Sequence, residues 1–199
     1  MANQFVNTYL TIFFLLTPFF ATSMFISLTQ SFDGRGRMRM AAQTTAAALV
    51  VVLVMFLWGG SIFRVLGIDV YCFQIGAGVL LFLTAVSLVR GGKEDLKVAE
   101  GEDISLVPLA IPVIAGPGTI GTLVVMGSDI SAAGRKAVAI CAIVAAVLTV
   151  GVLLLTANRL EKLLGAKGLS ALTKITGLVL SALAAQVVFG GVRNYLGMG

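Results

Sequence analysis

The residues of this sequence that could take part in chemistry or binding are few, and the first to consider are three glycines. Gly116, Gly118 and Gly121 have the spacing G-x-G-x-x-G of a dinucleotide-binding turn. That turn needs a preceding strand, a following helix and an acidic residue about 20 positions later. The nearest downstream acid, Asp129, comes too early, and residues 137–158 carry no charge at all. The glycines therefore do not indicate a nucleotide, and we expect no cofactor.

The inventory of reactive side chains argues against an enzyme. The sequence has no histidine, and Cys72 and Cys141 lie in or beside apolar stretches without a metal-ligand motif. A zinc site and a Cys–His nucleophile are therefore excluded, and no metal is expected. We expect the cysteines to be small packing residues, and the sequence does not decide whether they pair. All nine acidic residues fall at the ends of apolar stretches or in loops, so none can activate a hydroxyl at bilayer depth.

Composition indicates a membrane protein. Of the 199 residues 58% are hydrophobic and only 12% are charged, and the mean hydropathy is +1.03, more apolar surface than a soluble domain of this size could cover. Six uncharged stretches have at least 18 residues each, enough to cross a bilayer as a helix. They are residues 1–32, 40–63, 70–89, 104–128, 137–158 and 175–192. We predict an all-α membrane protein with six transmembrane helices in a single domain, residues 1–199.

Basic residues predict how these helices are oriented. The connections after the first, third and fifth spans carry ten of them, and the opposite side carries four. The ten are Arg35, Arg37, Arg39, Arg90, Lys93, Lys97, Arg159, Lys162, Lys167 and Lys174, and the four are Arg64, Arg135, Lys136 and Arg193. Because cytoplasmic loops are rich in Lys and Arg, we expect a multi-pass protein of the inner (plasma) membrane with both termini outside. The net charge of +5 suits anionic lipid and indicates no nucleic-acid partner.

The two halves of the chain match at a nearly constant offset. Thr17 and Pro18 lie in the middle of the first span, and Gly116 and Pro117 lie in the middle of the fourth, 99 positions later. The further matches are Val65-Leu66-Gly67 with Leu163-Leu164-Gly165, and Val79-Leu80 with Val179-Leu180. An odd number of spans per half inserts the halves in opposite orientations. We therefore predict an inverted-topology 3+3 repeat, residues 1–92 and 104–199.

The two mid-span prolines predict helix breaks. A proline within a helix removes the hydrogen bond to the carbonyl four residues earlier, which would free the carbonyls of Phe14 and Val113. Proline is favoured at the first position of a helix, after a cap such as Thr or Gly. We predict that spans one and four are discontinuous, with second halves that begin at Pro18 and Pro117 near the bilayer midplane. The alternative is that each proline only kinks its helix.

A half-helix that begins inside the membrane is a site for an anion. It presents unpaired N–H groups and about half a positive charge, which suit a carboxylate. Glycine would let a small ligand touch the backbone, and threonine hydroxyls with freed carbonyls could receive an ammonium group. A small zwitterionic amino acid has both groups. The predicted substrate-binding residues are Thr17, Pro18, Phe19, Thr22, Gly116, Pro117, Gly118, Thr119 and Thr122.

Three other polar side chains have expected places within the spans. Gln74 and Gln186 are expected to face inward, where interhelical hydrogen bonding is the main use of such residues. Lys174 is expected to extend its amine to the cytoplasmic interface. No acidic residue is predicted at bilayer depth, which disfavours a cationic substrate and leaves proton coupling without an obvious carrier.

The sequence resembles the MarC family of bacterial and archaeal inner-membrane proteins, which includes a small neutral amino acid transporter. The resemblance covers nearly the whole chain. Its motifs are PLAIPVIAGPGTI at residues 108–120, LLGAKGLSALTKITGLVL at 163–180 and IGAGVLLFLTAV at 75–86. It implies a transporter of glycine, alanine and similar amino acids, driven by a proton or sodium gradient. The family's first span usually has Asp or Asn before its proline and a small residue after it, where this chain has Thr17 and Phe19.

Two other functions fit the pattern less well. A polyspecific drug or metabolite efflux protein is expected to have a large, aromatic-lined cavity, whereas Gly, Thr and Ala dominate the candidate site. A passive channel has no sequence feature that separates it from a carrier. The sequence also leaves open the direction of transport and the oligomeric state.

Overall fold

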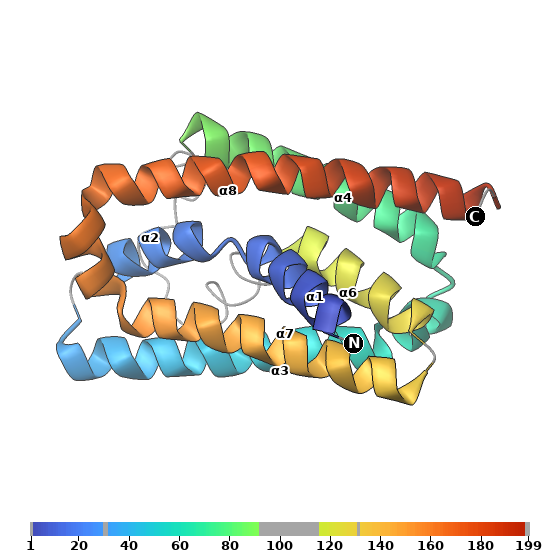
Figure 1. Ribbon diagram of the computed structural model, residues 1–199, viewed down its shortest axis with the longest axis horizontal. Helices are drawn as coiled ribbons and strands as arrows, with labels where there is room; N and C mark the ends of the chain where they lie inside the picture. The colour runs from blue at the N-terminus through green and yellow to red at the C-terminus, as the bar shows by residue number, and fades with distance from the viewer. Residues whose placement is uncertain (1, 30–31, 92–115, 131, 198–199) are drawn as a thin grey trace.

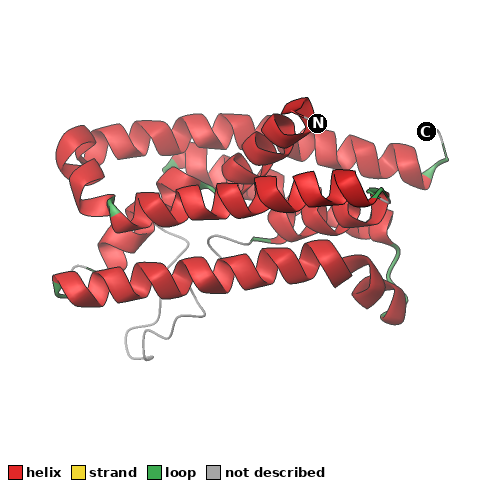
Figure 2. Ribbon diagram, turned by 60° about the horizontal axis from the view of Figure 1, so that its bottom comes forward, coloured by secondary structure: helices red, strands yellow, loops and turns green. Residues whose placement is uncertain are grey.

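The computed structural model describes residues 2–29, 32–91, 116–130 and 132–197, and the regular secondary structure in these ranges is entirely α-helical (Figures 1 and 2). The helices are α1 (Ala2–Leu15), α2 (Pro18–Leu28), α3 (Gly34–Val65), α4 (Val70–Arg90), α6 (Pro117–Asp129), α7 (Ala133–Leu155) and α8 (Ala157–Tyr195). Local sequence explains where several of them begin and end. Asp33 caps α3 by accepting a hydrogen bond from Gly36 N at 2.7 Å, and Asp69 caps α4 by accepting from Tyr71 N at 2.8 Å.

Five segments of the described chain are long and apolar enough to cross a membrane. They are Ala2–Leu28, Gly34–Val65, Val70–Arg90, Ala133–Leu155 and Ala157–Tyr195. They correspond to five of the six predicted spans, and the prediction of an all-helical, multi-pass protein is confirmed. Of the remaining predicted span, 104–128, only the part from residue 116 onward is described, and it contains the short helix α6.

The helices run roughly lengthwise, and their connections gather at two opposite ends (Figure 1). One end holds both chain termini and the α3–α4 and α6–α7 connections. The other end holds the α2–α3 and α7–α8 connections and the end of α4. The two groups of basic residues therefore lie at opposite ends as far as they are described, while Lys93 and Lys97 lie outside the described residues.

Glycines allow α4 and α8 to pack closely along their length. A Cβ atom on Gly78 of α4 would lie 2.6 Å from Val188 Cγ2, and one on Gly191 of α8 would lie 2.8 Å from Ile75 Cγ1. Any side chain at these positions would push the helices apart. Such small-residue contacts are the usual way in which helices associate in lipid, where burial of apolar surface gives little driving force.

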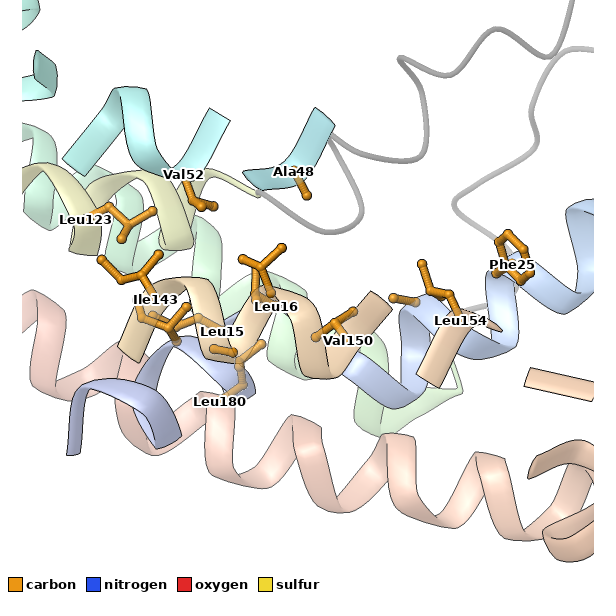
Figure 3. Close-up of a cluster of buried hydrophobic side chains, with 14 of the residues drawn as sticks. Leu15, Leu16, Phe25, Ala48, Val52, Leu123, Ile143, Val150, Leu154 and Leu180 are labelled. Atoms are coloured by element: carbon orange, nitrogen blue, oxygen red, sulfur yellow. The ribbon is translucent and has the colours of Figure 1, made fainter. Parts of the chain in front are cut away.

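Buried side chains from three other helices surround the connection between α1 and α2. Figure 3 shows Leu15 and Leu16 lying among Val52 of α3, Leu123 of α6 and Ile143 of α7. All five side chains are at most 3% exposed. This packing holds the α1–α2 connection against α3, α6 and α7.

Two matched glycines of the sequence halves share a conformation. Gly67, in the α3–α4 connection, has φ 69°, and Gly165 has φ 65°. The left-handed φ of Gly165 interrupts α8, which is therefore two helical segments joined at a kink. The kink is visible where the chain turns from α7 into the long part of α8 (Figure 1).

Candidate functional site

The first span is broken where the sequence predicts. Thr17 has φ 46° and ψ 57°, and it is the one non-glycine residue with a positive φ in the described chain. α1 ends at Leu15 and α2 begins with Pro18 in its first turn. The left-handed conformation costs a residue with a Cβ roughly 1–2 kcal/mol. The prediction that span one is discontinuous is therefore confirmed, and more than a proline kink separates its halves.

The carbonyl that the break exposes is not the predicted one. Phe14 O accepts a hydrogen bond from Thr17 N at 3.0 Å, so the expectation that Pro18 leaves this carbonyl free is wrong. The tight turn at Thr17 supplies the missing donor. The carbonyl of Leu15, the last residue of α1, instead accepts from the hydroxyl of Thr119 in α6 at 3.1 Å. Val113, the matching prediction in the second half, lies outside the described residues.

The second half of the fourth span also begins where the sequence predicts. α6 starts at Pro117, with Gly116 as its N-cap residue at φ −64° and ψ 171°. The Thr119 side chain is 1% exposed, so its bond to Leu15 O is shielded from solvent. Since these residues are 104 positions apart, the bond places the start of α6 directly beside the α1–α2 break. The residues before position 116, which would form the other half of this span, lie outside the described chain.

The first turns of α2 and α6 carry backbone donors. The first hydrogen bonds within these turns run from Ala21 N to Thr17 O and from Ile120 N to Gly116 O. The preceding N–H groups have no acceptor within their own helix, because the first turn of any α-helix lacks one. These groups belong to Phe19, Phe20, Gly118 and Thr119. Neither helix receives a cap from the side chain of its N-cap residue.

Two of the predicted threonines bond to their own helices. Thr22 Oγ1 donates to Pro18 O at 2.7 Å, and Thr122 Oγ1 donates to Gly118 O at 2.9 Å. A hydroxyl whose proton is used in this way can only accept a further hydrogen bond. Thr22 is fully buried and Thr122 is half-buried. Thr122 is therefore the better placed of the two to accept from a ligand.

Gly118 and Gly121 serve the packing of α6 on α4. A Cβ atom on Gly118 would lie 2.6 Å from Leu81 Cδ1, and one on Gly121 would overlap Ala77 Cβ. The space beside both Cα atoms is therefore already occupied by α4. The side of Gly118 that lacks a side chain is therefore not open to a ligand. Leu81 has no sequence signal that would have revealed this contact.

Aromatic rings pack against one another along α1 beside the break. Phe19, a predicted site residue, packs edge-on against Phe13 with ring centroids 6.5 Å apart. Phe13 in turn stacks on Tyr9, whose hydroxyl lies 3.1 Å from Thr149 Oγ1 of α7. These rings fill volume next to the break and limit the size of any molecule bound there.

The other residues singled out from the sequence differ in how exposed they are in the structure. Gln74 is 8% exposed, and its Oε1 atom has no hydrogen-bond partner among the described residues. Gln186 and Lys174 are exposed, so the expectation that Gln186 faces inward is wrong. Cys72 and Cys141 are free thiols and both are exposed, so they do not pair and are not interior packing residues.

The site is electrically neutral in its side chains. α1 and α2 contain no charged residue, and α6 has only Asp129, at its last position. Burial raises the pKa of the Asp129 carboxyl above its usual value. The described residues contain no group of three His, Cys, Asp or Glu side chains that could hold a metal ion. The polar groups at the site are therefore backbone amides, carbonyls and hydroxyls.

Comparison with known proteins identifies relatives of this chain. Residues 2–196 match the profile described as MarC family integral membrane protein. The chain belongs to the MarC family. A membrane protein of Methanocaldococcus jannaschii is 35% identical over 98% of both chains, and one of Aquifex aeolicus is 32% identical over 96% of this chain and 94% of its own.

The MarC relatives support the fold class but name no substrate. Both are described only as UPF0056 membrane proteins, as is a Bacillus subtilis relative that is 23% identical over 98% of this chain. No solved structure matches the chain. The function of this MarC protein therefore has to be argued from its own site.

Proposed function

We propose that this MarC protein is a secondary transporter of small neutral amino acids, with glycine and alanine as its main substrates. The substrate binds where the α1–α2 break meets the start of α6. Its carboxylate is held by first-turn N–H groups of the half-helices, and its ammonium group by carbonyl and threonine oxygens. A proton or sodium gradient across the inner membrane drives the transport.

The observation that carries the proposal is the hydrogen bond from Thr119 Oγ1 to Leu15 O. It joins the positive, N-terminal end of α6 to the negative, C-terminal end of α1, and α2 begins three residues after Leu15. Helix ends of both signs therefore meet at one place in the middle of the bundle. A zwitterion suits such a place, whereas an ion of one sign would be attracted by one end and repelled by the other.

The size and neutrality of the site support a small substrate without a further charge. Leu81 fills the space beside Gly118, and the rings of Phe13 and Phe19 occupy the space next to the break. An additional charge on the substrate would enter a region without a charged partner, which is costly in a membrane interior. Glycine and alanine satisfy both limits.

The packing of the helices supports the predicted inverted repeat. α2 packs on α8, and α6 packs on α4. α3 also packs on α7, and α4 on α8. Exchanging the two halves of the sequence exchanges α2 with α6, α3 with α7 and α4 with α8, so all four contacts are preserved. In transporters with such repeats, the substrate lies between the halves and each side opens in turn.

Uptake of labelled glycine into liposomes containing the purified protein tests the proposal. An imposed proton gradient or sodium gradient should cause glycine to accumulate above its external concentration. The gradient that causes this accumulation identifies the coupling ion. Alanine should compete, leucine should compete poorly, and lysine or glutamate hardly at all. Equilibration without accumulation would indicate a channel. Competition by lysine or by a bulky cationic drug would favour an efflux protein and contradict the proposed site.

A threonine variant connects the transport to the site. Thr122→Val removes the hydroxyl that can accept from an ammonium group, and glycine affinity should fall by about tenfold or more, the usual effect of losing a hydrogen bond to a charged group. Thr122→Ser keeps the hydroxyl and should bind glycine normally. Thr84 in α4 makes the same kind of bond, to Leu80 O at 2.9 Å, but on an exposed face. Thr84→Val is therefore the matched control and should leave affinity unchanged.

A further inference from the structure

One arginine connects three chain segments at the end of the bundle opposite the termini. Arg37, in the second turn of α3, donates from Nε to Thr29 O at 2.8 Å and from Nη1 to Asn158 Oδ1 at 2.7 Å. Thr29 is the C-cap residue of α2, and Asn158 lies in the first turn of α8. The guanidinium group therefore ties the end of α2 to the beginning of α8. A cation at the C-terminal end of α2 is also favoured by the helix dipole.

This connection borders a cavity of about 260 Å³. Arg37 and Asn158 form part of its wall, and Phe25, Leu154 and Ala157 contribute apolar surface. These three apolar side chains are each at most 2% exposed, so they are covered while the arginine bonds are in place. The cavity is large enough for a molecule the size of an amino acid, and the described residues that line it include no acidic side chain.

The cavity lies along α2 from the proposed substrate site. Phe25 is seven residues after Pro18, which is about 10 Å along a helix that rises about 1.5 Å per residue. α2 begins at the break and ends at Thr29, where Arg37 holds it. The cavity already opens to the surface beside Met38 and Leu155, which are exposed. A displacement of the end of α2 away from α8 would therefore uncover the buried side chains at the bottom of the cavity, while the start of α2 stays at the break.

We propose that Arg37 is a latch that closes this end of the transport path, by holding α2 to Asn158 at the start of α8. This inference rests on the proposed transport function. The Arg37–Asn158 bond is exposed, so it competes with water and is weak enough to open and close repeatedly. Arg37 is a positioning residue for transport, because it acts through α2 and does not bind substrate.

The latch is tested by the reactivity of a buried cysteine. Ala157→Cys places a thiol in the cavity wall, in a protein whose exposed Cys72 and Cys141 are replaced by alanine. The rate of its modification by N-ethylmaleimide in the purified full-length protein reports how often the end of α2 opens. Ala139→Cys is the matched control, because Ala139 is 0% exposed in the same helix bundle but near the opposite end of α7.

Variants of both partners should change this rate in a defined pattern. Asn158→Leu removes the acceptor and should raise the Ala157→Cys rate roughly three- to tenfold, which corresponds to the loss of one hydrogen bond. Asn158→Asp makes the bond charge-assisted and should lower the rate. Arg37→Lys replaces the forked donor by a point charge that cannot hold both acceptors, and should raise the rate. Combining Arg37→Lys with Asn158→Leu should add little, because both remove the same contact.

The Ala139→Cys rate should stay constant in all of these variants. An unchanged Ala157→Cys rate, or a parallel rise at both cysteines that indicates general loosening, would overturn the latch. The same experiment with saturating glycine tests the proposed function separately. Glycine should alter the Ala157→Cys rate in the protein with Arg37 and Asn158 intact. If the variants behave as expected but glycine neither alters the rate nor is transported, the latch stands and the proposed substrate is wrong.

Discussion

The hydroxyl of Thr119 donates a hydrogen bond to the backbone carbonyl of Leu15, 3.1 Å away and 104 residues earlier in the chain. This contact lies in the interior and connects the start of α6 with the end of α1. Leu15 O is one of the carbonyls that a helix leaves without an internal partner at its C-terminal end. The bond therefore satisfies an orphan acceptor of one half of the chain with a side chain from the other.

The first prediction is that this bond stabilises the fold. Thr119→Val keeps the shape of the side chain but removes the donor, so a buried carbonyl loses its partner, at a cost of about 1–3 kcal/mol. Thermal unfolding of the purified protein in detergent should show a lower Tm. Thr119→Ser retains the hydroxyl and should unfold close to the unmodified protein. Equal Tm values for the Val and Ser variants would show that the bond contributes nothing.

The second prediction concerns the contact of Gly118 with Leu81. Gly118→Ala inserts a methyl group where Leu81 already lies and should destabilise the protein by about 1–3 kcal/mol through overpacking. Alanine at position 81 would keep the Leu81 Cβ atom that lies 2.7 Å from the added methyl group, so the compensating change is Leu81→Gly, which removes that atom. The double variant should then be more stable than the sum of the two single effects predicts, by about 1 kcal/mol or more. Chemical unfolding of the four proteins measures this coupling.

Gly76→Ala is the control for this cycle. Gly76 lies in α4, where an added Cβ meets nothing within 4 Å, and alanine is the better helix former. It should be neutral or slightly stabilising, with no coupling to Leu81→Gly. Simple additivity of Gly118→Ala and Leu81→Gly would contradict the packing role of Gly118.

The broad architecture can be predicted from the sequence because the most informative patterns each concern one segment of the chain. An uncharged stretch of about 20 residues in a chain this apolar must be a membrane helix. A proline preceded by Thr17 or Gly116 similarly limits where a helix can begin, and α2 and α6 do begin at these prolines. These features need no knowledge of the neighbouring helices.

The contacts at the site could not be predicted, because they depend on how separate segments pack. Proline chemistry pointed to the carbonyl of Phe14, but the left-handed turn at Thr17 gives that carbonyl a local donor and leaves Leu15 to be satisfied by Thr119. Gly118 was interpreted as space for a ligand, while Leu81 occupies that space. Gln186 was expected to face inward from its polarity alone, yet it lies on an exposed face of α8.

The third prediction is a pH dependence of stability caused by Asp129. Desolvation raises the pKa of its carboxyl in the folded protein, so folding is favoured while the group is protonated. This contribution is complete below the unfolded pKa of about 3.9 and is lost as the pH rises through the higher folded value. Asp129→Asn should therefore raise the Tm at pH 7 and have less effect near pH 4. A Tm difference that is constant between pH 4 and pH 8 would contradict this explanation.

The fourth prediction concerns orientation in the membrane. α3 begins at the end of the bundle with the α2–α3 and α7–α8 connections and finishes at the end with both termini (Figure 1). Arg35 is the second residue of α3, and Leu66 is its C-cap residue. The richer group of basic residues is at the first of these ends, so we expect that end in the cytoplasm. Arg35→Cys should react with a membrane-impermeant maleimide only after the cells are permeabilised. Leu66→Cys, at a position that is 62% exposed, should react in intact cells.

The labelling has to be done without the two native thiols, because Cys72 and Cys141 are both exposed. Each reporter should also be labelled in permeabilised cells, which shows that it is reactive when the reagent can reach it. Reaction of Arg35→Cys but not Leu66→Cys in intact cells would reverse the orientation. The end of the bundle closed by Arg37 would then face outward, and the proposed latch would control entry of substrate from outside the cell instead of exchange with the cytoplasm.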